Sequence, residues 1–283
     1  MNRREFLQTS GGIVAGSAFG APMLHAMDGA LPAPLSRIGL ELYSVRRAMA
    51  RDFDRTLAAV RQIGYTDVEL LWSFDNWGKT TAQMKAALQR EGLRAPSAHM
   101  SPVSMLVGWQ RRLDMAKELG HEYLIVPSFT TETSHTLDDW REWADRFNQA
   151  GAVARRSGIW LAFHNEAEHM KPIDGQIPYD VFVQRTDPSV VRLQLDVGNM
   201  YIGGGDPMRY LERFKDRYWS FHIKDAVADR SSDIELGKGA IDIRRIIAAI
   251  PNISQKPLYV EQEGPADELA SVKQDFEYLK KLS

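Results

Sequence analysis

The chain contains no cysteine among its 283 residues. Without thiols it can form neither a disulfide scaffold nor a lipid anchor attached through cysteine. Beyond its N-terminal segment, no stretch approaches the roughly 18 to 20 consecutive apolar residues of a membrane-spanning helix. Stability must therefore come from a hydrophobic core, and with 44% hydrophobic residues the length fits one large globular domain or two small ones.

The chain also lacks an excess of charge of either sign. It carries 35 basic and 37 acidic residues, which gives a formal net charge of -2. A protein that binds nucleic acid through its phosphates is expected to carry a basic excess. The composition therefore predicts small molecules or neutral partners and no nucleic-acid partner.

Residues 1–26 have the pattern of an export signal. The adjacent Arg3 and Arg4 precede Phe6 and Leu7, and from there on the segment is small and apolar, with no Asp, Glu, Lys or Arg until Asp28. Several glycines and Pro22 in this segment argue against a buried helix. The paired arginines resemble a twin-arginine signal, which predicts a cleaved signal peptide, a periplasmic or otherwise exported protein, and no membrane attachment after cleavage.

From residue 36 to residue 283 the chain repeats one rhythm of short apolar runs and amphipathic stretches. A glycine ends each of several helical patterns a few residues before a run, as Gly64 and Gly92 do. Eight such units predict one α/β domain, a (β/α)8 TIM barrel. A doubly wound sheet is disfavoured because no run is followed by a GxGxxG turn. The runs start near Ile38, Asp67, Ala95, Tyr123, Ile159, Val191, Trp219 and Leu258.

Polar residues recur on one side of the predicted strands. Side chains alternate along a strand, so the apolar residues that face the helices define which positions point into the barrel. In the seventh strand this phase turns Trp219 and Phe221 outward, and Asp225 is expected as an outward-facing partner. The inward polar residues are Glu41 and Tyr43, Glu69, Ser97 and His99, His164 and Glu166, Arg192, Gln194 and Asp196, Ser220, His222 and Lys224, and Glu261 and Glu263.

These inward carboxylates and imidazoles lie toward the C-terminal ends of their strands, the face on which barrel active sites are built. A single buried histidine is usually a hydrogen-bonded core group. Acids and histidines at one rim on seven strands are harder to explain as hydrogen-bonded core groups, because unpaired buried charges are costly. A bound cation would neutralise several carboxylates. The pattern favours a divalent metal site over a purely structural network.

The segments FHNE, LQLDVGNMYIGGGDP, FHIKD, LGKGAID and YVEQE resemble those of the sugar phosphate isomerase/epimerase-like proteins of the xylose isomerase-like barrel superfamily. That superfamily includes inosose dehydratases and ketose epimerases, and the resemblance covers roughly Ser36 to Leu282. It implies one divalent ion, which Mn, Co, Zn or Mg would equally satisfy. Glu166 departs from the histidine common in relatives, so the fourth ligand is either His164 or Glu166. The implied ligands are His164, Asp196, His222 and Glu261.

The resemblance also implies abstraction of a proton α to a carbonyl in a sugar, keto sugar or cyclitol, by an isomerase, an epimerase, a dehydratase or a lyase. Glu261 is expected to serve as ligand and base, with His164 or Glu166 opposite. Lys224 would polarise a substrate oxygen, or else pair with Asp225 or Glu263. Expected substrate-binding residues are Glu69, His99, Asn199 and Glu263, although Glu69 and His99 equally suit the role of partners to ligating imidazoles.

Two further motifs have both a functional and a structural interpretation. The run GGGDP at 203–207 could form an anion-binding nest, but a helix start with Asp206 as N-cap and Pro207 at the first position is favoured. Aromatic residues follow the second and third strands, where they could stack on a sugar or pack between loops. They are Trp72, Phe74, Trp77 and Trp109.

Three other functions compete with the leading one. A non-catalytic sugar-binding barrel would keep the rim and lose the chemistry. An apurinic-site endonuclease would need more metal ligands and a basic surface. A glycosidase with two carboxylates is disfavoured because the fourth strand ends in LIVPSF, without an acid. Barrels of this kind often pair, so a homo-oligomer is compatible with the sequence.

Overall fold

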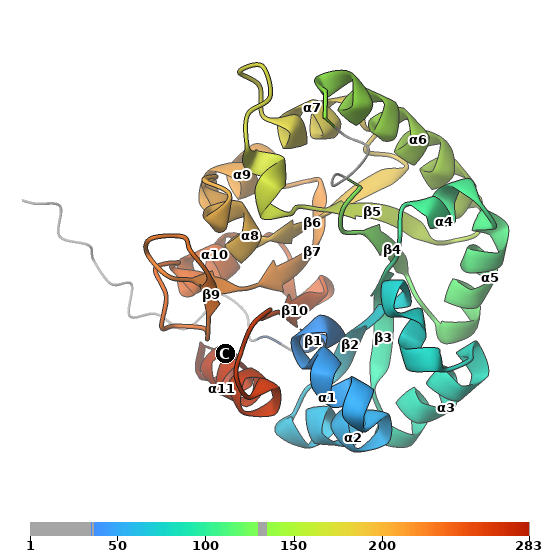
Figure 1. The fold of residues 1–283 in the computed structure, drawn as a ribbon, viewed down its shortest axis with the longest axis vertical. Helices are drawn as coiled ribbons and strands as arrows, with labels where there is room; N and C mark the ends of the chain where they lie inside the picture. Colours follow the sequence, from blue (N-terminus) through green and yellow to red (C-terminus); the bar gives the residue numbers. More distant parts are fainter. Residues whose placement is uncertain (1–34, 36, 130–134, 283) are drawn as a thin grey trace, which may run out of the picture.

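The computed structural model describes residues 35, 37–129 and 135–282, so the predicted signal at 1–26 lies outside the described residues. Eight parallel strands close into a barrel with the order β1-β10-β7-β6-β5-β4-β3-β2, and helices surround it (Figure 1). The predicted (β/α)8 barrel is confirmed, and each strand begins within one residue of its predicted start. The strands are β1 Gly39–Glu41, β2 Asp67–Leu71, β3 Arg94–His99, β4 Tyr123–Val126, β5 Trp160–His164, β6 Val191–Asp196, β7 Tyr218–Ile223 and β10 Leu258–Val260.

The helices form because their apolar residues recur on one face and their ends are capped. In α2, Phe53, Leu57 and Val60 are buried, and the side chain of Asp52 accepts a hydrogen bond from the backbone of Arg55. The helices are α1 Arg46–Arg51, α2 Phe53–Ile63, α3 Thr81–Glu91, α4 Val103–Leu106, α5 Trp109–Leu119, α6 Leu137–Arg156, α7 Pro178–Arg185, α8 Val197–Ile202, α9 Pro207–Arg213, α10 Ile243–Ala249 and α11 Glu268–Leu282. Among the described residues, no helix is long and apolar enough to span a membrane.

Shorter elements connect the strands to the helices. The four 3-10 helices of the described chain are η1 Leu42–Val45, η2 Trp72–Gly78, η3 Ala167–Met170 and η4 Ile253–Gln255, and a small hairpin follows β7, with strands β8 Asp225–Ala226 and β9 Asp233–Ile234. The predicted helix start at GGGDP is confirmed, because the Asp206 side chain caps α9 and Pro207 is its first residue. The predicted stops also hold, since Gly92 adopts φ 65° and Gly120 φ 78°, the left-handed region that favours glycine.

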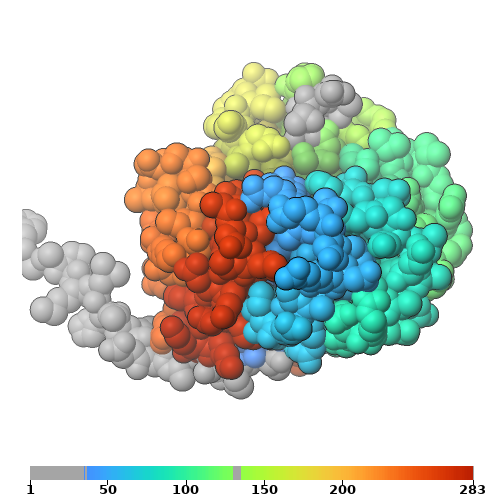
Figure 2. Space-filling model, turned by 60° about the horizontal axis from the view of Figure 1, so that its bottom comes forward, coloured from blue at the N-terminus to red at the C-terminus, as the bar shows by residue number. Residues whose placement is uncertain are grey.

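The first and last helices lie side by side, which closes the molecule. Figure 2 shows α11, in red, against α1 and α2, in blue. The carboxylate of Glu268, the first residue of α11, accepts hydrogen bonds from the backbone of Ala48 at 2.8 Å and from the guanidinium of Arg47 at 2.9 Å. The buried carboxylate thereby joins the last repeat to the first.

The N-terminal end of the barrel interior is filled by an arginine between two tryptophans. The guanidinium carbon of Arg192 lies 3.4 Å from the ring centres of both Trp160 and Trp219, an arrangement stabilised by cation–π attraction. Trp219 was predicted to face the helices, and that prediction was wrong. The β6–β7 register shifts so that Leu193 pairs with Tyr218 and Gln194 with Ser220, and this irregularity places Trp219 with the interior cluster.

Candidate functional site

A cavity of about 230 Å³ lies at the carboxyl ends of the strands. Larger hollows exist, including one of about 590 Å³ beside Arg51 and Asp52, but that one lies on the outer helices α1 and α2. Because parallel strands deliver their last residues to one rim, the smaller cavity gathers the acid and imidazole groups. Its lining residues are Glu41, Tyr43, Leu71, Ser73, Phe74, His99, Pro127, His164, Glu166, Glu261 and Glu263.

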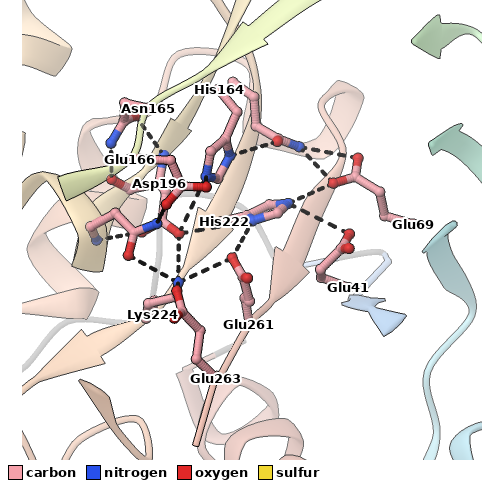
Figure 3. Close-up of polar contacts among 12 residues, drawn as sticks. Glu41, Glu69, His164, Asn165, Glu166, Asp196, His222, Lys224, Glu261 and Glu263 are labelled. Atoms are coloured by element: carbon pink, nitrogen blue, oxygen red, sulfur yellow. Dashed lines mark hydrogen bonds and ion pairs between the residues drawn. The ribbon is translucent and has the colours of Figure 1, made fainter. Parts of the chain in front are cut away.

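The structure brings the four predicted metal ligands together. His164, Asp196, His222 and Glu261 each offer one donor atom, and these atoms lie within 4.8 Å of one another (Figure 3). Oδ2 of Asp196 is buried; it lies 3.0 Å from the ammonium of Lys224, with which it forms an ion pair, and 3.8 Å from Nε2 of His164. Two imidazoles and two carboxylates gathered at one buried point fit a divalent transition metal. Glu166 lies farther toward the mouth, with its side chain 28% exposed.

The strand ends explain how Asp196 is held in this cluster. Asp196 ends β6 and caps α8, so its Oδ1 accepts a hydrogen bond from the backbone of Asn199 at 2.7 Å. The side chain of Asn165 bonds both the backbone N–H and the backbone carbonyl of Asp196, at 3.0 and 2.9 Å. Asn165 was not among the predicted residues, because strand alternation turns it away from the barrel interior.

Glu69 and Gln194 orient the imidazoles. Nε2 of His222 donates to Glu69 Oε1 at 2.6 Å, and Nδ1 of His164 lies 2.9 Å from Gln194 Oε1. Nε2 of His99 lies 3.0 Å from Glu69 Oε1 and 2.9 Å from Gln194 Oε1. Nδ1 of His222 lies 2.6 Å from Glu261 Oε2 and 3.9 Å from Asp196 Oδ2, and Nε2 of His164 faces Asp196 at 3.8 Å. Glu69 is fully buried, so its position matches the second of its two expected roles, a partner to a ligating imidazole.

Lys224 places a buried ammonium among the carboxylates. Its Nζ lies 3.0 Å from Asp196 Oδ2, 3.2 Å from Glu261 Oε2 and 2.7 Å from Glu263 Oε1. Asp225 and Glu263 were the two expected ion-pair partners of Lys224, and the structure shows the ion pair with Glu263. Lys224 also donates to Asn199 Oδ1 at 3.1 Å. Asn199 donates in turn to Glu166 Oε2 at 2.8 Å, so it links the ammonium to the carboxyl group at the mouth.

Asp225 differs from its prediction as an outward-facing partner. It is fully buried, and its carboxylate accepts hydrogen bonds from the backbone N–H groups of Ala226, Gly237, Gly239 and Ile241 at 2.8 to 3.1 Å. β7 ends at Ile223, so strand alternation no longer governs this position. Asp225 instead fixes the loop that follows β9.

Burial and charge shift the pKa values of the site in opposite directions. Burial favours neutral His222, but the carboxylates of Glu261 and Glu69 outweigh it and raise its pKa to about 10. Burial raises the pKa of Asp196 to about 7, although Lys224 opposes this. A cation at His222 would therefore displace a proton.

The pKa values of two carboxyl groups shift in opposite directions: Glu166, near the cavity mouth, and Glu261, in the cluster of metal-ligand candidates. Burial raises the pKa of Glu166 well above its ordinary value, despite the charge of Lys224. Burial acts in the same sense on Glu261, but Lys224 and His222 outweigh it and lower the pKa of Glu261 well below its ordinary value. Two carboxyl groups whose pKa values are shifted in opposite directions beside one cavity can serve as acid and base.

Glu41 is another residue of this site to which the sequence analysis gave no role. It ends β1, is fully buried and lines the cavity. Neither of its carboxyl oxygens has a hydrogen-bond partner among the described residues. Burial raises its pKa, and the charges of Glu69 and Glu261 raise it further. Its inward phase on the strand was the available signal.

The four aromatic residues separate into two groups. Trp72 and Trp109 are buried, and Nε1 of Trp109 donates to the carbonyl of Ala150 at 3.0 Å. Trp77 packs on Phe53, with ring centres 6.3 Å apart. Phe74 lines the cavity and is 44% exposed. Only Phe74 of these four lies at the cavity.

Comparisons with known proteins agree with this geometry. The chain is 22% identical over 194 residues to an inosose dehydratase of Bacillus anthracis, and the matched region spans 61% of this chain and 63% of that protein. A solved sugar phosphate isomerase/epimerase of Parabacteroides distasonis superposes with a TM-score of 0.74 and 25% identity, over 88% of this chain and 95% of the other. The IOLI protein, solved with a zinc atom, shares the fold with a TM-score of 0.65 and 14% identity, over 87% and 96%.

A family model agrees over most of the chain. The model for the xylose isomerase-like TIM barrel matches residues 57–282, a range that contains seven of the eight barrel strands and all four clustered metal-ligand candidates. The barrel topology, the site at its carboxyl rim and this match lead to one assignment. The chain belongs to the xylose isomerase-like TIM barrel family.

Proposed function

We propose that the chain is a metal-dependent enzyme that removes a proton α to a carbonyl in a sugar, keto sugar or cyclitol. The observation that carries the proposal is the cluster of His164, Asp196, His222 and Glu261 beside a cavity. A bound divalent cation would polarise the carbonyl and stabilise the negative charge that develops on its oxygen. Mn, Co, Zn and Mg all remain candidates.

Three residues of the chain would perform the proton transfers. Glu261, held ionised by Lys224 and His222, takes the proton from the carbon beside the carbonyl. Glu166, whose pKa is raised by burial, returns a proton to carbon or gives it to a departing hydroxyl. The Lys224 ammonium, 3.2 Å from Glu261, adds positive charge where negative charge develops on the substrate.

The relatives support this reaction class without separating its members. Their names describe an inosose dehydratase and a sugar phosphate isomerase/epimerase, and the IOLI structure holds zinc. Isomerisation, epimerisation and dehydration beside a carbonyl can all begin with loss of an α proton. Export through a twin-arginine signal belongs to the same proposal, and would bring the enzyme to sugars outside the cytoplasm.

The experiment measures bound metal and α-proton exchange together. Purified protein, incubated with manganese, cobalt or zinc, is assayed for metal by plasma mass spectrometry. It is then mixed in D2O with a panel of keto sugars and 2-keto-myo-inositol, and NMR follows deuterium at the α carbon. We expect about one metal ion per chain and exchange on at least one substrate.

The variant His222→Ala should lose the metal and lower exchange by about 100-fold or more, because it removes one ligand of four. The exposed His135→Ala variant is the matched control and should retain both. A His222→Ala protein with full metal content and full exchange, or a wild-type protein that takes up no metal, contradicts the proposal.

A further inference from the structure

A second group of metal-ligating side chains lies on the other side of His222 from the first. Glu41, Glu69, His99 and His222 each offer one donor atom, and these four atoms lie within 4.8 Å of one another. Figure 3 shows Glu41 and Glu69 on the opposite side of the His222 ring from Asp196. Apart from His222, the group comes from β1, β2 and β3, which contribute none of the four ligands proposed above.

Glu41 is the member of this group that indicates a missing ligand. Its side chain is fully buried, and neither of its carboxyl oxygens has a hydrogen-bond partner among the described residues. Its ion pair with His222 is long, since Nε2 lies 3.9 Å from Oε2, which is beyond hydrogen-bonding distance. A buried carboxyl group without a partner is costly. The position of Glu41 therefore requires either a bound proton or a cation beside it.

The distribution of charge at the rim favours the cation. Four carboxyl groups of the rim are buried, namely those of Glu41, Glu69, Asp196 and Glu261. The buried ammonium of Lys224 lies 3.0 Å from Asp196 and 3.2 Å from Glu261, and a metal ion at the ligands of the proposed function would lie on the same side. Neither positive charge is next to Glu41 and Glu69. The negative charge that remains is therefore on the side of β1 and β2.

Glu69 and His99 complete a set of three donors with Glu41. Oε1 of Glu69 lies 3.0 Å from Nε2 of His99, so one ion can contact both. Glu41 and His99 also line the cavity, so an ion bound to them would face the cavity and keep coordination positions open there. Two carboxylates and one imidazole form an oxygen-rich donor set, which suits manganese.

We propose that Glu41, Glu69 and His99 form a second divalent-cation site, suited to manganese, beside the site described above. His222 keeps its hydrogen bond to Glu69 and is not a ligand of the second ion. The inference goes beyond the proposed function, because it needs only these three side chains and no reaction.

The second ion is expected to bind less tightly than the first. It has three protein ligands in place of four, and it lies near another cation, which repels it. It is therefore lost when excess metal is removed, which leaves the single ion expected above. It should be observed only while free metal is present.

The test counts bound manganese in the presence of free manganese. The metal-free full chain is titrated with manganese, and electron paramagnetic resonance measures the free hydrated ion. We expect the wild type to bind about two ions per chain, the second at least about tenfold more weakly than the first. Crystals soaked in manganese should show one anomalous peak beside Asp196 and a second peak among Glu41, Glu69 and His99.

Two variants separate the sites. Glu41→Gln keeps the size of the side chain and removes its charge, so it should retain the first ion and lose the second, which leaves about one ion per chain. Asp196→Asn should do the reverse and keep only the weaker ion. The exposed Glu118→Gln variant is the matched control and should bind both ions.

The outcomes distinguish the second site from the proposed function. A single ion that persists in Glu41→Gln and is lost in Asp196→Asn overturns the second site, with Glu41 protonated instead, and leaves the proposed function intact. A single ion with the opposite behaviour supports the second site and overturns the ligand set of the proposed function. Two ions that both persist in Glu41→Gln, a single anomalous peak beside Asp196, or no ion in the wild type overturns the second site.

Discussion

Glu69 lies outside the proposed ligand set but orients one of its imidazoles. It is fully buried and accepts hydrogen bonds from His222, Gln194 and Ser97. A carboxylate in this position fixes which nitrogen of His222 carries a proton, and so which nitrogen is free to bind a cation.

Replacing Glu69 with glutamine should lower metal affinity by about 10- to 100-fold. The amide is nearly isosteric, but it lacks the negative charge and no longer offers two equivalent acceptor oxygens to His222 and His99. Competition with a chelator of known affinity measures the loss. The exposed Glu122→Gln variant is the control, and an affinity for Glu69→Gln equal to that of the wild type would show that Glu69 does not orient the imidazole.

At single residues, strand alternation predicted the inward position of the metal-ligand candidates but failed at two other residues. His164, Asp196 and His222 lie within strands, where side chains alternate, and their inward phase is what brings them to the rim. Asp225 lies past the end of β7, and Trp219 lies at a register shift, so alternation failed for both. Glu41 lies 3.9 Å from Nε2 of His222, and these surroundings are set by the finished fold, so one sequence does not contain them.

Among the elements, the loop between β9 and α10 depends on one side chain. Four backbone N–H groups between residues 226 and 241 donate to the carboxylate of Asp225. The hairpin also reaches the site, because the backbone of Glu263 donates to Asp233 Oδ2 at 2.6 Å. The motifs FHIKD and LGKGAID are therefore joined by a structural contact in addition to any catalytic one.

The variant Asp225→Ala should lower the free energy of unfolding by about 2 to 4 kcal/mol, since it leaves several buried N–H groups without an acceptor. Hydrogen exchange should speed up at Gly237, Gly239 and Ile241 before it does in the barrel strands. Chemical denaturation and exchange mass spectrometry measure both effects. Asp229→Ala, at an exposed turn where the carboxylate accepts only from its own backbone region and Ser231, is the control; equal protection of the loop in both variants would contradict the clamp.

For the whole molecule, the spacing of the apolar runs was enough to predict the barrel, because a repeat of strand, helix and two loops has few other closed solutions. The boundary between repeats was set by glycines that end helices, as Gly92 does at φ 65°.

The dependence of stability on pH is a different property. It depends on which carboxyl groups the finished fold buries, and Asp275 in α11 is the clearest case away from the site.

Asp275 should make the protein less stable as pH rises from about 4 to about 7. It is 1% exposed, accepts a hydrogen bond from the backbone of Leu236 at 2.7 Å, and has a pKa raised to about 7 by burial. The unfolded value is about 3.9, so in this range the folded state binds more protons than the unfolded state. The free energy of unfolding therefore falls with increasing pH, by at most about 1.4 kcal/mol per pH unit from this group.

Asparagine at position 275 keeps the acceptor for Leu236 and removes the charge, so Asp275→Asn should gain stability relative to the wild type across this range, by up to about 4 kcal/mol between pH 4 and pH 7. Urea denaturation at half-unit steps of pH measures the difference. Groups of the active site titrate equally in both proteins and cancel from it. The exposed Asp216→Asn variant should track the wild type, and a difference between Asp275→Asn and wild type that does not change with pH would mean that Asp275 is ionised in the folded protein throughout.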